Sequence, residues 1–423
     1  MEKMKDSGVK WIGSIPKNWK IKKIKYITKI PITDGPHETP VFVDEGVPFY
    51  SVDGIQNEHI IYEPCRYISI EDANRFDKKE IPLYGDILMG KAASIGKIAI
   101  IDRKIRMQIW SPLAIIRANE NIVNNIFLKY YLLSNSAQTE IELKSTSNTQ
   151  KNIAMEDIEN IIIPLPSIDE QKLIACFVDK KVMNIDEILK KLNNQIEILE
   201  NYKKSLITET VTKGLNTNIE MKNSEIDWIG DIPKHWDIYY LKHLFKMYAG
   251  GDADEYDFSA EYSEVTPYPI YSNSLENDGL FGYMSKYRFS GNTFTVTGRG
   301  DVGKAIARNN KYYPIVRLLV CIPLFEDDTR YYSYCVNSAD LLGEQTAMAQ
   351  LTTQKLGINK FPRPPIYEQK EIADYLDKKC KEIDELVEDK KQQIEKMVQY
   401  KKSLIYEYVT GKKRVKGAEE LYG

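Results

Sequence analysis

Residues 170–213 read EQKLIACFVDKKVMNIDEILKKLNNQIEILENYKKSLITETVTK, and residues 368–411 read EQKEIADYLDKKCKEIDELVEDKKQQIEKMVQYKKSLIYEYVTG. Roughly half of the aligned positions are identical and no gap is needed, which is the signature of an internal repeat. Neither segment contains Pro or Gly before Gly214 and Gly411, where Gly is the usual end of a helix. The stretch therefore predicts two long helices of related sequence.

Apolar residues in both copies follow the a and d positions of a coiled coil. The first copy has Val178, Val182, Ile185, Leu189, Leu192, Ile196 and Leu199, and the same register in the second gives Leu376, Cys380, Ile383, Val387, Lys390, Ile394 and Met397. A single amphipathic helix usually packs on its own domain, but two matched seams favour a pair of helices packed on each other. At 1.5 Å per residue each helix is expected to be roughly 65 Å long.

Composition limits the class of protein. A chain of 423 residues is long enough for two or three domains. Its five cysteines lack CxxC spacing, which predicts a reduced, cytoplasmic protein without a structural zinc site. The start of the sequence has no signal-peptide core and no run approaches a membrane span. The net charge of −3 gives no global basic excess, so a surface that binds nucleic acid must be a local pattern.

A second repeat precedes each helix. MKDSGVKWIGSIPKNW begins at Met4 and MKNSEIDWIGDIPKHW begins at Met221, with Trp and Pro at the same offsets. Buried Trp rings and a rigid Pro at fixed spacing indicate an anchor at the entry of a domain. The order is thus anchor, insert, long helix, and then the same again. This frame predicts domains at 1–166 and 215–365, long helices at 167–214 and 366–412, and a basic tail at 413–423.

Both inserts alternate short β-rich runs with Gly, Pro and Asp and then contain a helical stretch, which predicts a compact α+β domain in each. They share few landmarks. GDILMGKAASIGK from Gly85 aligns with GNTFTVTGRGDVGK from Gly291, with one extra residue in the first loop, and TQK at 149–151 aligns with TQK at 353–355. A duplicated frame around diverged inserts suggests that two different things are bound.

Catalytic motifs are missing or weak. The segment 298–304, GRGDVGK, nearly matches a phosphate-binding loop, but Ala305 replaces the hydroxyl residue and AIARNNKYY resembles a strand and turn more than a helix. The four histidines form no metal-ligating pattern. The sequence also lacks the motifs of an adenine methyltransferase and of a serine hydrolase. We therefore predict a chain without an active site.

Binding remains as the function. Bases are read by Arg, Lys, Asn and Gln, while Lys and Arg on phosphates set the register. If the partner is DNA, the candidate contacts are Lys91, Lys97, Gln150, Lys151, Tyr271, Arg299, Lys304, Gln354 and Lys355. A coiled-coil scaffold whose two domains bind proteins fits the near-neutral composition equally well and stays open as the alternative.

At this point the chain resembles the specificity (S) subunits of type I restriction–modification enzymes over essentially its whole length. The resemblance rests on the paired WIG-x-IP-K-x-W anchors, TQKN at 149–152, IPLPSIDEQ at 163–171, and the EQ-headed helices that contain YKKSLI. It implies two target recognition domains, each reading one half of a bipartite asymmetric DNA site. It also implies two long helices packed antiparallel as a ruler.

The resemblance further implies partners and cofactors. The repeated frame would dock two methyltransferase (M) subunits, and restriction (R) subunits would join them. S-adenosylmethionine, ATP and magnesium would be bound by those partners and none by this chain. After Gln354 and Lys355 the second insert departs from the family's TQKN pattern, which puts the role of Lys355 in question.

Overall fold

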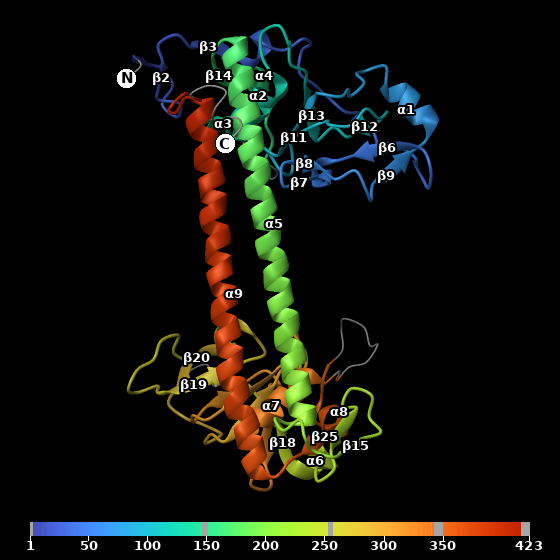
Figure 1. Cartoon of the computed structure of the whole chain (residues 1–423), viewed down its shortest axis with the longest axis vertical. Coiled ribbons are helices and arrows are strands. Elements are labelled where there is room, and N and C mark those ends of the chain that lie inside the picture. Colours follow the sequence, from blue (N-terminus) through green and yellow to red (C-terminus); the bar gives the residue numbers. More distant parts are fainter. Residues whose placement is uncertain (1–2, 146–150, 253–256, 340, 342–349, 416–423) are drawn as a thin grey trace. The chain divides into compact units, whose positions relative to one another are not determined.

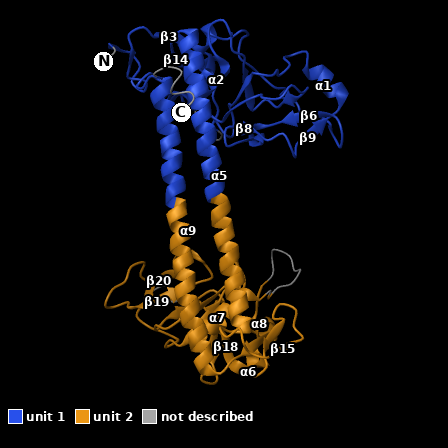
Figure 2. Ribbon diagram, in the orientation of Figure 1, with its two compact units in different colours: residues 1–192, 392–423 blue, residues 193–391 orange. Residues whose placement is uncertain are grey.

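The computed structural model describes residues 3–145, 151–252, 257–339, 341 and 350–415. The chain forms two compact units, drawn in Figures 1 and 2. Unit 1 joins residues 1–192 to residues 392–423, and unit 2 is residues 193–391. Each unit therefore contains one α+β domain, the start of one long helix and the end of the other.

The first domain enters and leaves through paired strands. Its anchor is an antiparallel hairpin of β1 (Met4–Asp6) and β2 (Ser14–Pro16). The next strand, β3 (Lys20–Lys23), leads into the 3-10 helix η1 (Ile24–Tyr26) and pairs antiparallel with β14 (Ile162–Leu165). Because β14 runs directly into helix α5 (Ile168–Lys213), the helix is attached to the domain at this strand pair.

The body of the first domain contains two four-stranded sheets. One has the order β11-β10-β13-β4 and the other β12-β6-β9-β5. Their strands are β4 (Thr33–Asp34), β10 (Ile87–Gly90), β11 (Ile98–Ile100) and β13 (Leu113–Ile116), and β5 (Phe42–Val43), β6 (Val47–Tyr50), β9 (Arg66–Ile68) and β12 (Gln108–Ile109). The remaining elements are η2 (Val52–Gly54), β7 (Ile55–Gln56), β8 (His59–Ile60), α1 (Ile70–Phe76), α2 (Asn125–Leu133), α3 (Asn135–Lys144) and α4 (Met155–Glu159).

The first of these sheets lies between two hydrophobic cores, so its central strands are apolar on both faces. Ile87 and Met89 of β10 pack in the core that contains α2 and α3, whereas Leu88 packs in a second core with Tyr50 and Ile109. Successive residues of a strand point to opposite faces. The continuous apolar runs in the sequence are therefore buried strands.

The second domain repeats this plan. Its anchor hairpin is β15 (Met221–Asn223) with β16 (Asp231–Pro233), and its entry and exit strands are β17 (Asp237–Tyr240) and β25 (Lys360–Arg363). Its main sheet has the order β18-β24-β21-β22, made of β18 (Phe245–Ala249), β21 (Thr293–Val296), β22 (Ala305–Arg308) and β24 (Leu319–Pro323). The others are β19 (Tyr268–Tyr271), β20 (Leu280–Met284), β23 (Tyr313–Pro314), η4 (Glu276–Gly279), α6 (Leu241–Leu244), α7 (Thr329–Ser338), α8 (Thr353–Gly357) and α9 (Ile366–Val409).

Helices α5 and α9 run antiparallel in each unit, as predicted. In unit 1, Asp186 binds Lys401 at 2.9 Å and Phe177 packs against Tyr408. In unit 2, Lys203 binds Asp384 at 2.7 Å and Gln195 accepts from Lys390 at 2.7 Å. The partner's number falls as the α5 number rises, which is the antiparallel order. The predicted seam residues Val178, Val182, Ile185, Leu192, Leu376, Ile383 and Val387 are buried, and Leu189, Ile196, Leu199, Ile394 and Met397 are half-buried. The burial of this seam stabilises the pair.

The anchors hold the start of a helix, which explains why the two repeats occur together. Trp19 and Trp236 are fully buried, and their indole N–H groups donate to Glu170 at 3.2 Å and Glu368 at 2.8 Å. The next residue, Gln171 or Gln369, is buried and accepts a backbone N–H at the start of α2 or α7. The EQ pair at the head of each helix is thus a fixed joint. The other Trp of each anchor is only half-buried, contrary to the expectation for both rings.

Two sequence alignments between the inserts are wrong. The backbone N–H of Ile153 donates to Lys91 and that of Leu351 donates to Gly298, so Ile153 and Leu351 occupy the same position. TQK at 353–355 then lies in α8, which matches α4 at residues 155–157 and not TQK at 149–151. Likewise the hairpin 90–97 matches 297–304, eight residues each, without the extra residue. The sequence alignment followed short identical triplets such as TQK. The correct alignment follows the hydrogen bonds between strands, which only the structure reveals.

Candidate nucleic-acid interface

In each domain, three turns lie at the same ends of the strands of the main sheet. We call this group of turns the loop end. In the first domain it comprises residues 35–37, 91–96 and 110–112, and in the second residues 250–252, 298–303 and 315–317. The same backbone hydrogen bonds form in both. Ser111 donates to Pro36 at 3.1 Å and Val316 to Gly251 at 3.0 Å, while Gly96 donates to Gly90 at 2.9 Å and Gly303 to Thr297 at 2.8 Å. The two loop ends therefore share one frame of backbone hydrogen bonds and carry different side chains.

Glycine is required where these turns cross. A Cβ on Gly35 would lie 2.0 Å from the carbonyl oxygen of Ile109, and a Cβ on Gly250 would lie 2.8 Å from that of Pro314. Side chains do not fit at such distances, so only glycine lets the first turn pass over the third. The crossing holds the turns close together and presents their other side chains outward.

In the first domain the loop end surrounds a buried carboxylate. Asp34 forms ion pairs with Lys91 at 3.0 Å and with Lys79, and it is hydrogen-bonded to His37 at 3.1 Å. Burial opposes ionisation of Asp34, but hydrogen bonds and charge from Lys79 and Lys91 outweigh it and hold its pKa below the usual range. One carboxylate thus positions two lysines and an exposed histidine at this end of the sheet.

In the second domain the turns are joined by one amide side chain. The Oδ1 atom of Asn273 accepts the N–H of Gly298 at 2.7 Å, and its Nδ2 donates to the carbonyl oxygen of Val316. Val316 and Arg317 both have left-handed backbone angles, with φ of 49° and 60°, which are unfavourable for residues with a Cβ. The side chain of Arg317 is exposed and donates to Oε1 of Gln350 at 3.3 Å.

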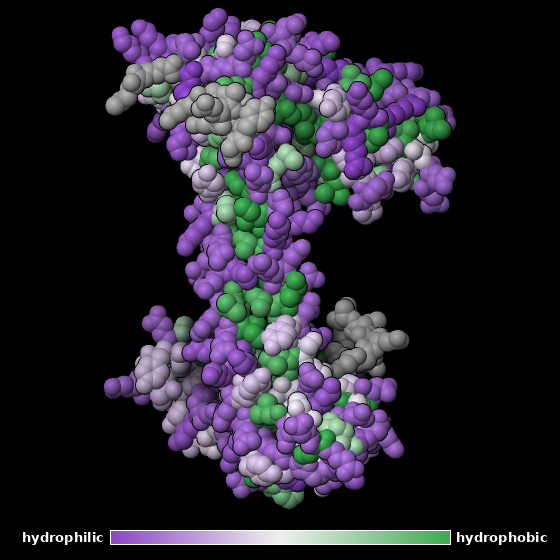
Figure 3. Space-filling model, viewed as in Figure 1, coloured by the Kyte–Doolittle hydropathy of each residue, from purple (hydrophilic) through white to green (hydrophobic). Residues whose placement is uncertain are grey.

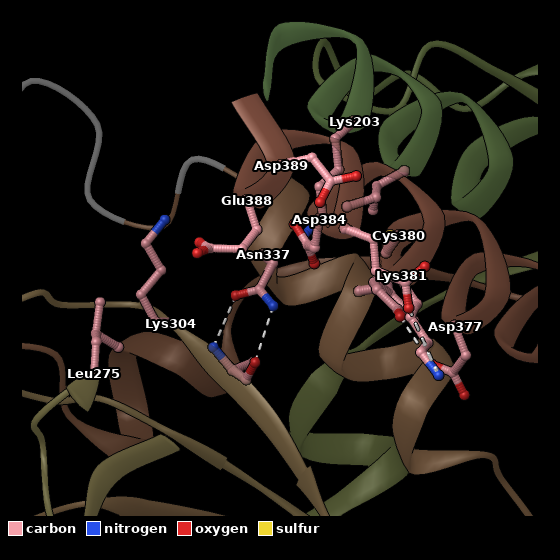
Figure 4. Close-up of a pocket in the computed structure, with 14 residues that line it drawn as sticks. Lys203, Leu275, Lys304, Asn337, Asp377, Cys380, Lys381, Asp384, Glu388 and Asp389 are labelled. Carbon is pink, nitrogen blue, oxygen red and sulfur yellow. Dashed lines mark hydrogen bonds and ion pairs between the residues drawn. The ribbon is translucent and has the colours of Figure 1, made fainter. Parts of the chain in front are cut away.

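The structure places two predicted contacts, Lys91 and Arg299, at the loop ends. Arg299 is exposed on the turn 298–303. Lys97 and Lys304 both follow these turns at matching positions, but their surroundings differ. Lys97 donates to the carbonyl oxygen of Val52 at 3.4 Å, whereas Lys304 lines a cavity of about 850 Å³ with several carboxylates of α9, Glu388 among them (Figure 4).

The other predicted contacts lie elsewhere. The ring of Tyr271 covers the buried guanidinium of Arg308, 3.7 Å from the ring centre, and burial lowers the pKa of that arginine. Lys151 pairs with Glu142 at 2.5 Å on the surface. Gln354 and Lys355 are exposed on α8, whose Gly357 lies against Met247 of β18. Gln150 is outside the described residues. Their role in binding DNA stays a prediction.

Sequence reasoning missed Asp34, Asn273, Arg317 and Gln350. None belongs to a recognisable motif, because each acts across a distance in sequence that only the sheet register closes. The turn 315–317 could have been identified from its equivalence to the turn 110–112. That match requires the parallel pairing of β23 with β19 and of β12 with β6.

The region near Lys304 offers no phosphate-binding loop. Strand β22 begins at Ala305, where such a loop requires the start of a helix. Across the part of the chain that the structure describes, no His, Cys, Asp and Glu side chains gather in a group that could hold a metal ion. Over the same residues, every helix is too short or too polar to cross a membrane.

The fold and the two loop ends define a class of protein. Its members contain an internal duplication, with two α+β domains attached to a pair of antiparallel helices. The family model for the type I restriction modification DNA specificity domain matches residues 16–198 and 233–396. The chain belongs to this family, and its two domains are target recognition domains.

Relatives agree with this assignment. A putative type I restriction enzyme specificity subunit, MjaX of Methanocaldococcus jannaschii, is 28% identical over 384 residues, which cover 86% of this chain and 87% of the relative. The EcoBI specificity subunit of Escherichia coli is 25% identical over 50% of this chain and 45% of its own length. A chain in a solved structure on the complex assembly and conformational transition of the type I R-M system shares the fold, with a TM-score of 0.71 and 13% identity over 93% of this chain and 98% of that one.

Proposed function

We propose that this chain is the non-catalytic, sequence-reading subunit of a type I restriction–modification complex, and that it binds double-stranded DNA at a bipartite asymmetric site. The observation that carries the proposal is the pair of loop ends: one backbone frame, duplicated, with different exposed side chains. A conserved frame places both domains on DNA in the same way, and differing side chains read different bases. Each domain then reads one half-site.

The helices have a separate role in this proposal. Helix α5 is 46 residues long and α9 is 44, and neither contains Pro or Gly. Continuous, paired helices resist bending better than a loop of equal length. They would fix the number of base pairs between the two half-sites.

Apolar side chains exposed on these helices supply surfaces for protein partners. Figure 3 shows green, apolar patches among the purple, polar residues along the helices. On α5, Met183 is exposed in unit 1, and Ile198 and Tyr202 are exposed in unit 2, four residues apart and therefore adjacent on the helix surface. Exposed apolar patches on soluble surfaces mark sites of protein association. We assign them to the docking of methyltransferase subunits, with restriction subunits joining that complex.

In this proposal the partner subunits carry out catalysis. S-adenosylmethionine for adenine methylation, and ATP and magnesium for translocation and cleavage, would be bound by M and R subunits. The present chain selects the DNA sequence at which those subunits act.

The test is methylome sequencing of a host that carries this gene with its neighbouring M gene, compared with a host in which only this gene is deleted. We expect N6-methyladenine at one bipartite motif with a fixed spacer, and its loss in the deletion. A second strain carries the gene with Leu192→Asp and Ile196→Asp, which are expected to disrupt the helix pair and so to abolish methylation at the fixed spacer. Unchanged adenine methylation in the deletion, with both genes expressed, would overturn the proposal and favour a protein-binding scaffold.

A further inference from the structure

The turn 315–317 of the second domain differs from its counterpart in a way that bears on base reading. It is attached to its neighbours like the turn 110–112, since Ile315 donates to Tyr271 at 2.9 Å and Trp110 donates to Tyr50 at 2.9 Å. Its own backbone differs, because Val316 and Arg317 are left-handed whereas Pro112 is held at a negative φ by its ring. The equivalent third residues are Arg317 and Pro112. One domain therefore presents a guanidinium at a point where the other presents a ring without any hydrogen-bond donor.

The position of Arg317 is held by its neighbours. A Cβ on Gly298 would lie 2.9 Å from the carbonyl oxygen of Arg317, so the two turns are in close contact only because residue 298 is glycine. Asn273 fixes the same junction from the other side, through hydrogen bonds to both turns. Val316 and Arg317 are two consecutive left-handed residues with a Cβ, and such strained backbone persists where the surroundings impose it. The exposed arginine thus projects from a rigid turn.

The guanidinium has capacity for a ligand. It has five N–H donors in a planar fork, and among the described residues only Gln350 is bonded to it, through a single contact of 3.3 Å to Nη1. Gln350 is itself half-buried and occupies the position equivalent to Asn152, which forms a β-bridge with Ala92 in the first domain. The amide therefore contacts one arm of the fork, and within the described part of the chain the other donors have no partner.

From this geometry we infer that Arg317 reads a guanine in the half-site of the second domain, with Gln350 and Asn273 as positioning residues. Guanine presents two acceptors, O6 and N7, at the spacing of an arginine fork, and arginine on guanine is the commonest specific contact in the major groove. This inference rests on the proposed function. It further implies that the half-site of the first domain lacks this contact, because Pro112 has no donor.

The experiment compares Arg317→Ala and Arg317→Lys with the wild type, each co-expressed with the M subunit, by methylome sequencing and by methylation of oligonucleotides that vary one base at a time. We expect both variants to lose discrimination at one guanine of one half-site by roughly 5- to 150-fold, the value of one bidentate contact. The other half-site and the spacer are expected to stay unchanged. Lysine keeps the charge but cannot form the fork, so it should not restore discrimination.

The matched control is Lys246→Ala, which removes an exposed cation from the opposite end of the same sheet, on β18. It is expected to leave the motif unchanged. A uniform loss of methylation at all sequences in Arg317→Ala, restored by lysine, would identify a phosphate contact and overturn the inference. An unchanged motif in both variants would overturn it as well. If the wild type itself methylates no bipartite motif, the proposed function fails, not this assignment alone.

Discussion

Replacing Gln369 tests whether the buried joint at the head of α9 holds the second domain to its helix. Its Oε1 accepts the N–H of Asp328 at 2.8 Å, and its Nε2 donates to Pro364 and to Asp327, each at 2.9 Å. The change Gln369→Ala removes these three hydrogen bonds and leaves buried polar groups without partners. At about 1 kcal/mol for each bond, plus the cost of the cavity, we expect a loss of about 3–5 kcal/mol.

A charged replacement sharpens the test because the two domains differ here. In Gln369→Glu the new carboxylate faces Asp327, whereas Gln171 of the first domain bonds only backbone groups, at Asn124, Ile122 and Pro166. Gln369→Glu should therefore destabilise more than Gln171→Glu. Both glutamate variants still leave acceptors facing each other, so each should melt below the wild type.

Thermal unfolding followed by circular dichroism measures these differences. One kcal/mol shifts the midpoint of a domain of this size by about 2–4 °C, so Gln369→Ala should melt about 6–20 °C lower. The control is the neighbouring exposed residue, Lys370→Ala, which loses only a surface ion pair with Glu326 and should shift the midpoint by less than about 2 °C. Equal midpoints for Gln369→Ala and Lys370→Ala would refute the role of the joint.

Three further predictions concern the helix pair, an ion pair and a glycine. Leu192→Asp with Ile196→Asp should lower the melting midpoint, because both side chains lie in the seam, while exposed Asn194→Asp should not; equal midpoints would argue against paired helices. Asp34→Asn should lower the free energy of unfolding in urea by about 2–3 kcal/mol at pH 7. The pKa of Asp34 in the folded protein lies below 3.8, so its carboxylate stabilises the fold above that pH. The difference in stability between wild type and variant should vanish as the pH falls through the folded pKa. Gly411→Ala should destabilise more than Gly230→Ala although both have left-handed angles, since only the first Cβ meets a neighbour, Pro16 at 2.4 Å; similar melting midpoints would contradict this.

The sequence by itself determined the duplicated frame. A seam repeated over two helices and an anchor repeated before them required paired helices and two domains, because periodic burial is a local property of the chain. The burial of Trp19 and Trp236 also followed from spacing, although the same spacing wrongly predicted burial of Trp11 and Trp228. The sequence also predicted the strand after Lys304, which excludes a phosphate-binding loop. Each of these features depends on residues that are close together in the sequence.

Only the tertiary structure decided which side chains gather at the loop ends. Asp34 and Lys91 lie 57 positions apart in sequence, as the difference of their numbers shows, and they meet at 3.0 Å because β4 and β10 both flank β13. Arg317 acquired its place through a parallel strand pairing and through Asn273, neither of which has a sequence signal. Identical TQK triplets misled the comparison of the inserts for the same reason. Register is set by hydrogen bonds between distant strands, and a single sequence does not record them.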